Sequence, residues 1–171
     1  YGDNQSSGAN LVDQFPNDAT QWNDTDGDGY GDNKYGSQGD KFPLDPNRWK
    51  DTDDDGYADE DDAFPNDRTQ WNDTDGDGHG DNPFGIEADK FPNDAGNWSD
   101  IDDDGYADDY DAFPSDMTQW NDTDSDGYGD ELFGNRGDAC PNEYGNSTAD
   151  MFGCIDTDGD GVSDANDAFD D

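Results

Sequence analysis

A nine-residue pattern, Asp-x-Asp-x-Asp-Gly-x-x-Asp, occurs six times along this chain and restricts its fold more than any other feature. Aspartates at alternate positions, with a glycine at the sixth, are typical of calcium loops, because the ion takes about six to eight oxygen ligands and the glycine permits a sharp turn. Chance can place one such pattern in an acidic chain, but not six. The copies begin at Asp24, Asp51, Asp73, Asp100, Asp122 and Asp156.

The chain has too few apolar residues for an ordinary hydrophobic core. Its 171 residues include 48 acidic and 7 basic side chains, for a net charge of −41, while Leu, Ile, Val and Phe together number 17. Ordering the backbone costs about 1–2 kcal/mol per residue, and these apolar groups cannot offset that cost. We therefore expect a mostly irregular fold, disordered without metal, whose folding free energy comes from metal binding.

The six loops alternate between two lengths. Their starts lie 27, 22, 27, 22 and 34 residues apart, and such periodicity is typical of repeat arrays in which each unit contacts its neighbours. A short repeat closes with an aspartate at position 12, whereas a long repeat has five extra residues before its closing aspartate. The predicted segments are 1–23 (a truncated repeat and connector), the long repeats 24–50, 73–99 and 122–155, and the short repeats 51–72, 100–121 and 156–171.

Each loop offers a set of oxygen ligands that suits Ca2+. The carboxylates at positions 1, 3, 5, 9 and the closing position would join the backbone carbonyl at position 7. In the long repeats the predicted ligands are Asp24, Asp26, Asp28, Tyr30, Asp32 and Asp40; Asp73, Asp75, Asp77, His79, Asp81 and Asp89; and Asp122, Asp124, Asp126, Tyr128, Asp130 and Asp138. In the short repeats they are Asp51, Asp53, Asp55, Tyr57, Asp59 and Asp62; Asp100, Asp102, Asp104, Tyr106, Asp108 and Asp111; and Asp156, Asp158, Asp160, Val162, Asp164 and Asp167.

Aromatic residues recur at two further places. Each five-residue extension contains an aromatic–glycine pair, which we interpret as a local bulge held by the ring: Tyr35-Gly36, Phe84-Gly85 and Phe133-Gly134. In the connectors, Phe and Trp stand seven residues apart at 15/22, 42/49, 64/71, 91/98 and 113/120. This spacing predicts one Phe–Trp contact per connector, with turns at Pro and Asn-Asp. Regular secondary structure should otherwise be limited to single helical turns, such as one at 59–63.

The last connector contains both cysteines. Cys140 occupies the phenylalanine position and Cys154 the tryptophan position, two residues before Asp156. We therefore predict a disulfide in place of the aromatic contact, which closes a loop of about 15 residues and stabilises the fold by roughly 3 kcal/mol. A disulfide indicates an oxidising compartment, and we expect an extracellular or cell-surface location.

These motifs resemble the thrombospondin type 3 repeats. That family strings Asp-x-Asp-x-Asp-Gly-x-x-Asp-x-x-Asp loops on a chain with little regular secondary structure, and residues 138–141, Asp-Ala-Cys-Pro, match its Cys-Pro step. The other repeats carry Phe-Pro there, like a microbial surface-protein version of the repeat. The resemblance implies a chain wrapped around calcium ions, about two per repeat. Ligands for a second ion would come from Asp18, Asp45, Asp67, Asp94 and Asp116 in the connectors, or from Asp54, Asp61 and Asp103 in the loops.

Other classes of protein fit the sequence less well. EF-hand pairs need flanking helices and usually a glutamate at position 12, whereas this chain has aspartate there, followed by Phe-Pro or a similar step. A charge of −41 repels nucleic acid and anionic membranes, and no apolar run approaches the ~20 residues that cross a bilayer. His79, the only histidine, stands at position 7, where we expect only its carbonyl to matter. We therefore do not expect an enzyme.

The ends of the chain and its Asn-x-Ser/Thr sequences leave alternatives open. Residues 1–4 match the second half of a loop and 167–169 begin a connector, so the chain is an excerpt, a processed product, or a protomer that joins copies of itself head to tail in an open filament. The Asn-x-Ser/Thr sequences are either glycosylation sites or a by-product of the repeated connector–loop junction. They lie at Asn4, Asn23, Asn72, Asn97, Asn121 and Asn146.

Together these features favour an extracellular calcium-binding structural protein that acts as a spacer, stalk or fibre subunit. Calcium is the one cofactor that we expect, at six loops or more. The alternatives are a flexible acidic polymer that buffers calcium or contacts mineral at a cell surface, and a non-catalytic module of a larger secreted adhesin or enzyme.

Overall fold

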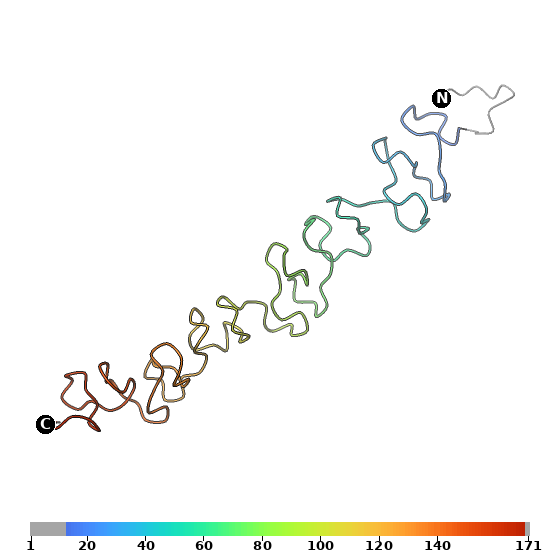
Figure 1. Cartoon of the computed structure of the whole chain (residues 1–171). Helices are drawn as coiled ribbons and strands as arrows, with labels where there is room; N and C mark the ends of the chain where they lie inside the picture. Colours follow the sequence, from blue (N-terminus) through green and yellow to red (C-terminus); the bar gives the residue numbers. More distant parts are fainter. Residues whose placement is uncertain (1–12, 170–171) are drawn as a thin grey trace. The chain divides into compact units, whose positions relative to one another are not determined.

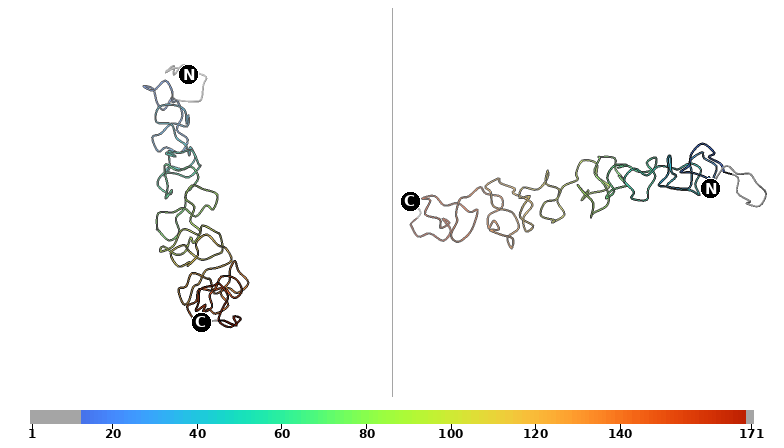
Figure 2. Two further views of the ribbon diagram at one scale, coloured as in Figure 1. Left: turned by 90° about the vertical axis from the view of Figure 1, so that its left-hand side faces the viewer. Right: turned by 90° about the horizontal axis from the view of Figure 1, so that it is seen from above.

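The computed structural model describes residues 13–169, and over this range it contains no helix and no strand longer than a single bridge. The bridges are Gly31–Gly39 and Gly80–Ala88, both parallel. Figures 1 and 2 show the backbone as a succession of loops. The mostly irregular fold that the sequence predicts is thereby confirmed. The partial loop expected at residues 1–4, with Asn4, lies outside the described range.

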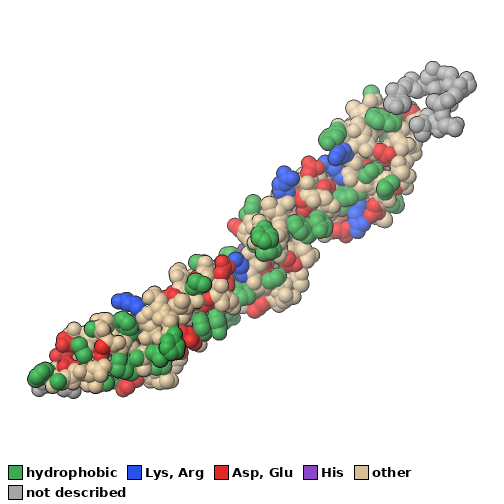
Figure 3. Space-filling model, viewed as in Figure 1, with side chains coloured by type: hydrophobic (Ala, Val, Ile, Leu, Met, Phe, Trp, Pro, Cys, Tyr) green, Lys and Arg blue, Asp and Glu red, His purple; other side chains and the backbone are tan. Residues whose placement is uncertain are grey.

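The chain divides into two units, Tyr1–Asp89 and Lys90–Asp171, and the contacts below are those within each unit. Within the described residues, the only fully or nearly buried hydrophobic side chains are Ala58, Ala107 and Cys154. Large apolar side chains lie instead at the surface, as the green atoms on the face shown in Figure 3 illustrate. None of the residues described forms an apolar helix of membrane-spanning length.

Each loop turns at two left-handed residues. Position 4 has φ between 62° and 85° and position 6, always glycine, has φ between 92° and 103°. In the first loop the Asp24 carboxylate accepts hydrogen bonds from the Gly27 amide (2.6 Å) and the Gly29 amide (3.0 Å) across this turn. The predicted sharp turn at the sixth residue is therefore present, and Asp54, Asp103 and Ser125 make the position 4 turn without glycine.

A second set of hydrogen bonds closes the loop at position 9. The Asp32 carboxylate accepts from the Thr25 amide (2.8 Å), the Thr25 hydroxyl (2.7 Å) and the Asn23 side-chain amide (2.6 Å). Although burial alone raises the pKa of Asp32, these hydrogen bonds bring it below its ordinary value. Asn72 and Thr74 bind Asp81 in the same way. The recurrent Asn-Asp-Thr sequence thus has a structural role, and glycosylation at Asn23 or Asn72 stays a prediction.

A buried glutamine, not an aromatic ring, holds each five-residue extension. Gln70 is 1% exposed; its Oε1 accepts from the Asn82 amide (2.9 Å), and its Nε2 donates to the carbonyls of Asn82 (3.1 Å) and Ile86 (3.2 Å). Gln21 and Gln119 make the equivalent bonds. The prediction of a bulge held by its ring was wrong, because the rings point into solvent: Tyr35 is 85%, Phe84 94% and Phe133 99% exposed.

The glycines of the extension make room for this glutamine. A Cβ on Gly36 would lie 2.6 Å from both Gln21 Nε2 and the Thr20 carbonyl oxygen, closer than packed atoms approach. The glutamine stands directly before the connector tryptophan ahead of each long loop, whereas Arg48 and Asn97 hold that place ahead of two short loops. The residue before the connector tryptophan therefore correlates with the length of the loop that follows.

The connector tryptophans stack on tyrosines. Tyr57 and Trp71 lie with ring centroids 5.2 Å apart and planes 5° from parallel, and the pairs Tyr30–Trp49 and Tyr106–Trp120 are alike. The side chain at position 7 of a loop thus contacts the connector that follows, whereas the sequence predicted a role only for the carbonyl at this position. The predicted Phe–Trp contact was wrong for connectors 42–49, 64–71 and 113–120, whose tryptophans stack on these tyrosines instead.

The helical turns predicted after position 9 are present only as hydrogen-bonded turns. The Asp61 amide donates to the Ala58 carbonyl (2.8 Å), and the Asp111 amide to the Ala107 carbonyl (3.0 Å). A small residue at position 8 lets these turns pack closely, since Ala58 and Ala107 are 3% and 7% exposed.

Replacing the buried glutamine should destabilise a long repeat. Gln70→Met keeps the length of the side chain but leaves the Asn82 amide and two carbonyls without partners, at a cost of about 1–3 kcal/mol. Urea unfolding in excess calcium, followed by tryptophan fluorescence, measures the change. The control is Gln38→Met at an exposed position, which should change the free energy by less than about 0.5 kcal/mol; equal effects would contradict the role of Gln70.

Candidate metal sites

The first three aspartates of a loop converge on one point. In five loops, one carboxylate oxygen from each of positions 1, 3 and 5 lies within 4.8 Å of the others. Each such group could hold a metal ion. The five groups are Asp24, Asp26 and Asp28; Asp51, Asp53 and Asp55; Asp73, Asp75 and Asp77; Asp100, Asp102 and Asp104; and Asp122, Asp124 and Asp126.

Buried oxygens without hydrogen-bond partners lie in these groups. In the first loop, the Oδ2 atoms of Asp26 and Asp28 are inaccessible to solvent and accept no hydrogen bond. A buried carboxylate oxygen without a donor is costly, and a bound cation is one way to compensate it. The same holds for Oδ2 of Asp53, Asp55, Asp75, Asp77, Asp102, Asp104 and Asp124.

The closing aspartate of a long repeat reaches the same place despite the extension. Asp40 is 1% exposed; its Oδ1 accepts from the Phe42 amide (2.6 Å), and its Oδ2 is buried without a partner. Burial, and then the charges of Asp28, Asp26 and Asp32, raise its pKa. Parallel bridge contacts between Gly31 and Gly39 bring the two ends of the extension together. The five extra residues therefore do not remove Asp40 from the loop.

Backbone carbonyls add further acceptors. The position 7 carbonyls of Tyr30, Tyr57, Tyr106 and Tyr128 accept no hydrogen bond from any residue that the structure describes. With the carboxylates they form an all-oxygen set, without the sulfur or imidazole that zinc or copper would favour. The donor set fits a hard divalent cation, which the carboxylates at positions 1, 3 and 5 could hold, and the carbonyl at position 7 and the closing aspartate stay predicted further ligands.

The other predicted ligands have hydrogen-bond or ion-pair partners. The position 9 carboxylates bind the residue at position 2, as Asp32 does, so their role as direct ligands stays a prediction. In the connectors, Asp18 and Asp116 accept from the threonine two residues later. Asp54, Asp61 and Asp103 pair with Lys41, Arg48 and Lys90. A second ion at these acids also stays a prediction.

The terminal loop repeats the hydrogen-bond pattern with more exposed aspartates. Asp156 accepts from the Gly159 amide (2.7 Å) and the Gly161 amide (2.8 Å), as Asp24 does in the first loop. Its position 9 residue, Asp164, binds Thr157. Asp158 and Asp160 are exposed, so this loop is less enclosed than the other five.

The last connector contains the Cys140–Cys154 disulfide, the pair that the sequence indicates. Cys140 does occupy the phenylalanine position, because its amide donates to Asp138 (2.7 Å) as that of Phe42 does to Asp40. Phe152, not Cys154, occupies the tryptophan position: its carbonyl accepts from the Ala139 amide (2.9 Å) and its ring stacks on Tyr128 at 5.7 Å. The disulfide is therefore an addition to the aromatic contact rather than its replacement.

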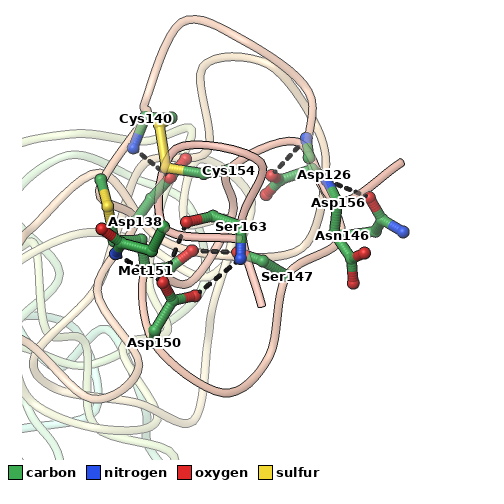
Figure 4. Close-up of a disulfide and its surroundings, with 12 residues drawn as sticks. Asp126, Asp138, Cys140, Asn146, Ser147, Asp150, Met151, Cys154, Asp156 and Ser163 are labelled. Atoms are coloured by element: carbon green, nitrogen blue, oxygen red, sulfur yellow. Dashed lines mark hydrogen bonds between the residues drawn. A yellow bond between two sulfur atoms is a disulfide. The ribbon is translucent and has the colours of Figure 1, made fainter. Parts of the chain in front are cut away.

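This connector also touches the fifth candidate metal site. Figure 4 shows Asp138 and Asp126 close to the disulfide loop. The Gly145 amide donates to Asp126 Oδ2 (3.0 Å), and Gly153 lies so close to Asp138 that a Cβ there would clash with the carboxylate. Burial, and then the charges of Asp126, Asp124 and Asp130, raise the pKa of Asp138 to about 6.

The connector then binds the terminal loop. The Asp150 carboxylate accepts from the Ser163 amide (2.8 Å), the Ser163 hydroxyl (3.0 Å) and the Asn166 side-chain amide (2.6 Å). These hydrogen bonds hold the pKa of Asp150 well below its ordinary value. The role of Asp150 was not predicted from the sequence, because Asp150 lies outside the repeated pattern.

The chain matches no protein-family model, and a search of curated proteins finds no match.

Acidification should release metal from the fifth site first. The pKa of Asp138 in the fold, about 6, lies above its ordinary 3.8. Protonation as the pH falls through this window therefore stabilises the metal-free fold and competes with the metal, which needs the ionised carboxylate. Calorimetric titration with calcium at about pH 7.5 and pH 5.5 should show one class of sites weaken at the lower pH. In Asp138→Asn that class should be weak at both pH values, and a site equally strong at both in the unmodified chain would contradict the prediction.

Removing the disulfide should weaken the same site. With Cys140→Ser and Cys154→Ser together, the connector that positions the Gly145 and Cys140 amides becomes free to move, at a cost of roughly 3 kcal/mol in stability. Native mass spectrometry at limiting calcium should then find one ion fewer per chain. The other loops carry the same motif without the disulfide connector and serve as the internal control, so a loss shared by all loops would refute the coupling.

Proposed function

We propose that this chain is an extracellular calcium-binding structural protein, a spacer, stalk or fibre subunit that folds only when calcium is bound. The single observation that carries the proposal is the convergence of buried carboxylate oxygens without hydrogen-bond donors in successive loops. Such groups are unfavourable in a metal-free chain, and an ion at each would turn repulsion into attraction.

The composition of the interior supports a role for the ion in folding. Between residues 13 and 169, the side chains below 2% exposure are Gln70, Gln119, Asp40, Asp138, Ser147 and Ser163, all polar. Without apolar burial, the hydrophobic effect supplies little of the free energy of folding. Binding to the loops is the remaining source of comparable size, since binding to the folded chain alone adds directly to its stability.

The choice of calcium and of location rests on chemistry and resemblance. Flexible all-oxygen sites without preformed octahedral geometry favour calcium over magnesium, and the loop sequence resembles the thrombospondin type 3 repeat. The disulfide supports an oxidising compartment outside the cytosol. At the affinity typical of extracellular calcium modules, about 10⁻⁴–10⁻³ M, the ions would act as permanent structural parts rather than as a signal.

Chelation tests the proposal. Small-angle scattering and near-ultraviolet circular dichroism of the full chain should show a compact, ordered state in calcium and an expanded chain in EDTA, with at least six ions per chain by native mass spectrometry. Magnesium at equal concentration is the matched control and should restore less order. An expanded chain in both conditions, with weak graded binding, would instead support the flexible calcium-buffering polymer.

A variant in one loop distinguishes the loss of a metal-binding carboxylate from a simple reduction of the net negative charge. Asp53→Asn removes one of the convergent carboxylates, whereas Asp109→Asn removes an exposed one with no hydrogen bond to a loop. We expect only Asp53→Asn to lose an ion and lower the thermal midpoint in calcium. If the two variants behaved alike, net charge rather than site geometry would control the fold.

A further inference from the structure

Residues 145–150, here called the bridging segment, contact two loops at once: the fifth loop, which begins at Asp122, and the terminal loop, which begins at Asp156. The Gly145 amide donates to Oδ2 of Asp126, at position 5 of the fifth loop (3.0 Å). The next residue, Asn146, accepts through its Oδ1 from the Asp156 amide, at position 1 of the terminal loop (3.2 Å; Figure 4). Two adjacent residues therefore each bind a candidate metal-binding residue of a different loop.

The rest of the bridging segment holds the backbone of the terminal loop. The amides of Thr148 and Ala149 both donate to the carbonyl of Gly161 (2.9 and 2.8 Å), at position 6, where the loop makes its left-handed turn. The Asp150 carboxylate accepts from the amide and hydroxyl of Ser163, at position 8. Positions 1, 6 and 8 of the terminal loop are thus all tied to the bridging segment.

The bridging segment is packed tightly against the end of the disulfide loop. A Cβ on Gly145 would lie 2.2 Å from the Gly153 carbonyl oxygen. The amides of Asn146 and Ser147 both donate to the Cys154 carbonyl (3.0 Å each), and Ser147 has no exposed surface. Close-packed segments joined by hydrogen bonds transmit a displacement at one end to the other. The bridging segment is therefore suited to link the state of one loop to the state of the next.

The terminal loop has less protein around its carboxylates than the fifth loop has. Asp158 and Asp160, at positions 3 and 5, are exposed, whereas Asp124 and Asp126 at the same positions of the fifth loop are half-buried. The terminal loop consequently depends more on contacts made by its backbone. Most of those contacts come from the bridging segment.

We propose that the bridging segment couples the two loops, so that an ion in the fifth loop raises the affinity of the terminal loop for calcium. An ion held by Asp126 fixes the carboxylate that binds Gly145, and with it the segment that orders the terminal loop. Such coupling is reciprocal and typically changes affinity by about 5- to 150-fold. Asp150 is a positioning residue, because it acts on the loop through Ser163. This inference rests on the proposed function, since it concerns the order in which the calcium loops fill.

Nuclear magnetic resonance of the full chain, titrated with calcium, can follow each loop separately. The amide at position 6 donates to the position 1 carboxylate in the fourth, fifth and terminal loops, at 3.0, 3.0 and 2.8 Å. The signals of these amides, Gly105, Gly127 and Gly161, therefore report on equivalent places. The calcium concentration at the midpoint of each response is the quantity to compare.

A substitution in the fifth loop should weaken the terminal loop. Asp124→Asn removes one convergent carboxylate of the fifth loop and should raise the calcium midpoint of Gly161 by about fivefold or more. Asp102→Asn makes the same change at position 3 of the fourth loop and is the matched control. It should leave the midpoint of Gly161 within about twofold of its original value, as expected for independent sites.

A substitution in the bridging segment tests reciprocity. Asp150→Asn should raise the midpoint of Gly127 as well as that of Gly161, whereas a purely local structural role would change Gly161 alone. In the chain that carries both Asp124→Asn and Asp150→Asn, the effect of Asp124→Asn on Gly161 should be smaller than in the unmodified chain, because the coupling is already weakened. Strictly additive effects would overturn the proposal.

The same titration distinguishes failure of the coupling from failure of the calcium sites. If none of the three glycine signals responds to calcium, the proposed function is wrong. If Gly105 and Gly127 respond, but Gly161 either does not respond or has the same midpoint in Asp124→Asn as in Asp102→Asn, the calcium sites stand and the coupling is wrong.

Discussion

Repulsion between aspartates is the constraint on which the structure depends. Two unit charges 4.8 Å apart repel by roughly 3 kcal/mol at an effective dielectric constant of about 20, before screening by solvent, and five of the loops bring three carboxylates within that distance. Backbone amides oppose part of this repulsion, as the Gly27 and Gly29 amides do at Asp24. Burial first, and then the charges of neighbouring aspartates, raise the pKa values of Asp40 and Asp138, so ionisation of these two carboxylates is unfavourable in the metal-free fold.

The chain replaces a hydrophobic core with hydrogen bonds of fixed geometry. Position 9 carboxylates bind position 2, buried glutamines satisfy the backbone of the extensions, and stacked rings join each loop to its connector. These contacts are short in sequence, spanning mostly 2 to 17 residues. Each repeat can therefore form its own contacts locally, in contrast to a globular domain whose core requires contacts between distant segments.

The loops were predictable from sequence, because the motif specifies both the oxygen-bearing residues and the glycine turn. The aromatic contacts were not, because a spacing recurs with the repeat whether or not the two residues touch. Phe64 and Trp71 have a spacing that is the same in every connector, whereas the stacked partners Tyr57 and Trp71 have a spacing that differs between short and long repeats. The role of Gln70 was also missed, since a single buried polar residue leaves no hydropathy signal. Its occurrence before tryptophan only ahead of long loops was the available clue.

The connector tryptophan and the residue before it face opposite neighbours. Trp71 stacks on Tyr57 in the preceding short loop, whereas Gln70 enters the following long loop. Any recombination that joined this connector to another short loop would leave the glutamine amide with nothing to bind. Gene duplication in steps of a long and a short repeat preserves both partners, so arrays of this type should grow or shrink by pairs.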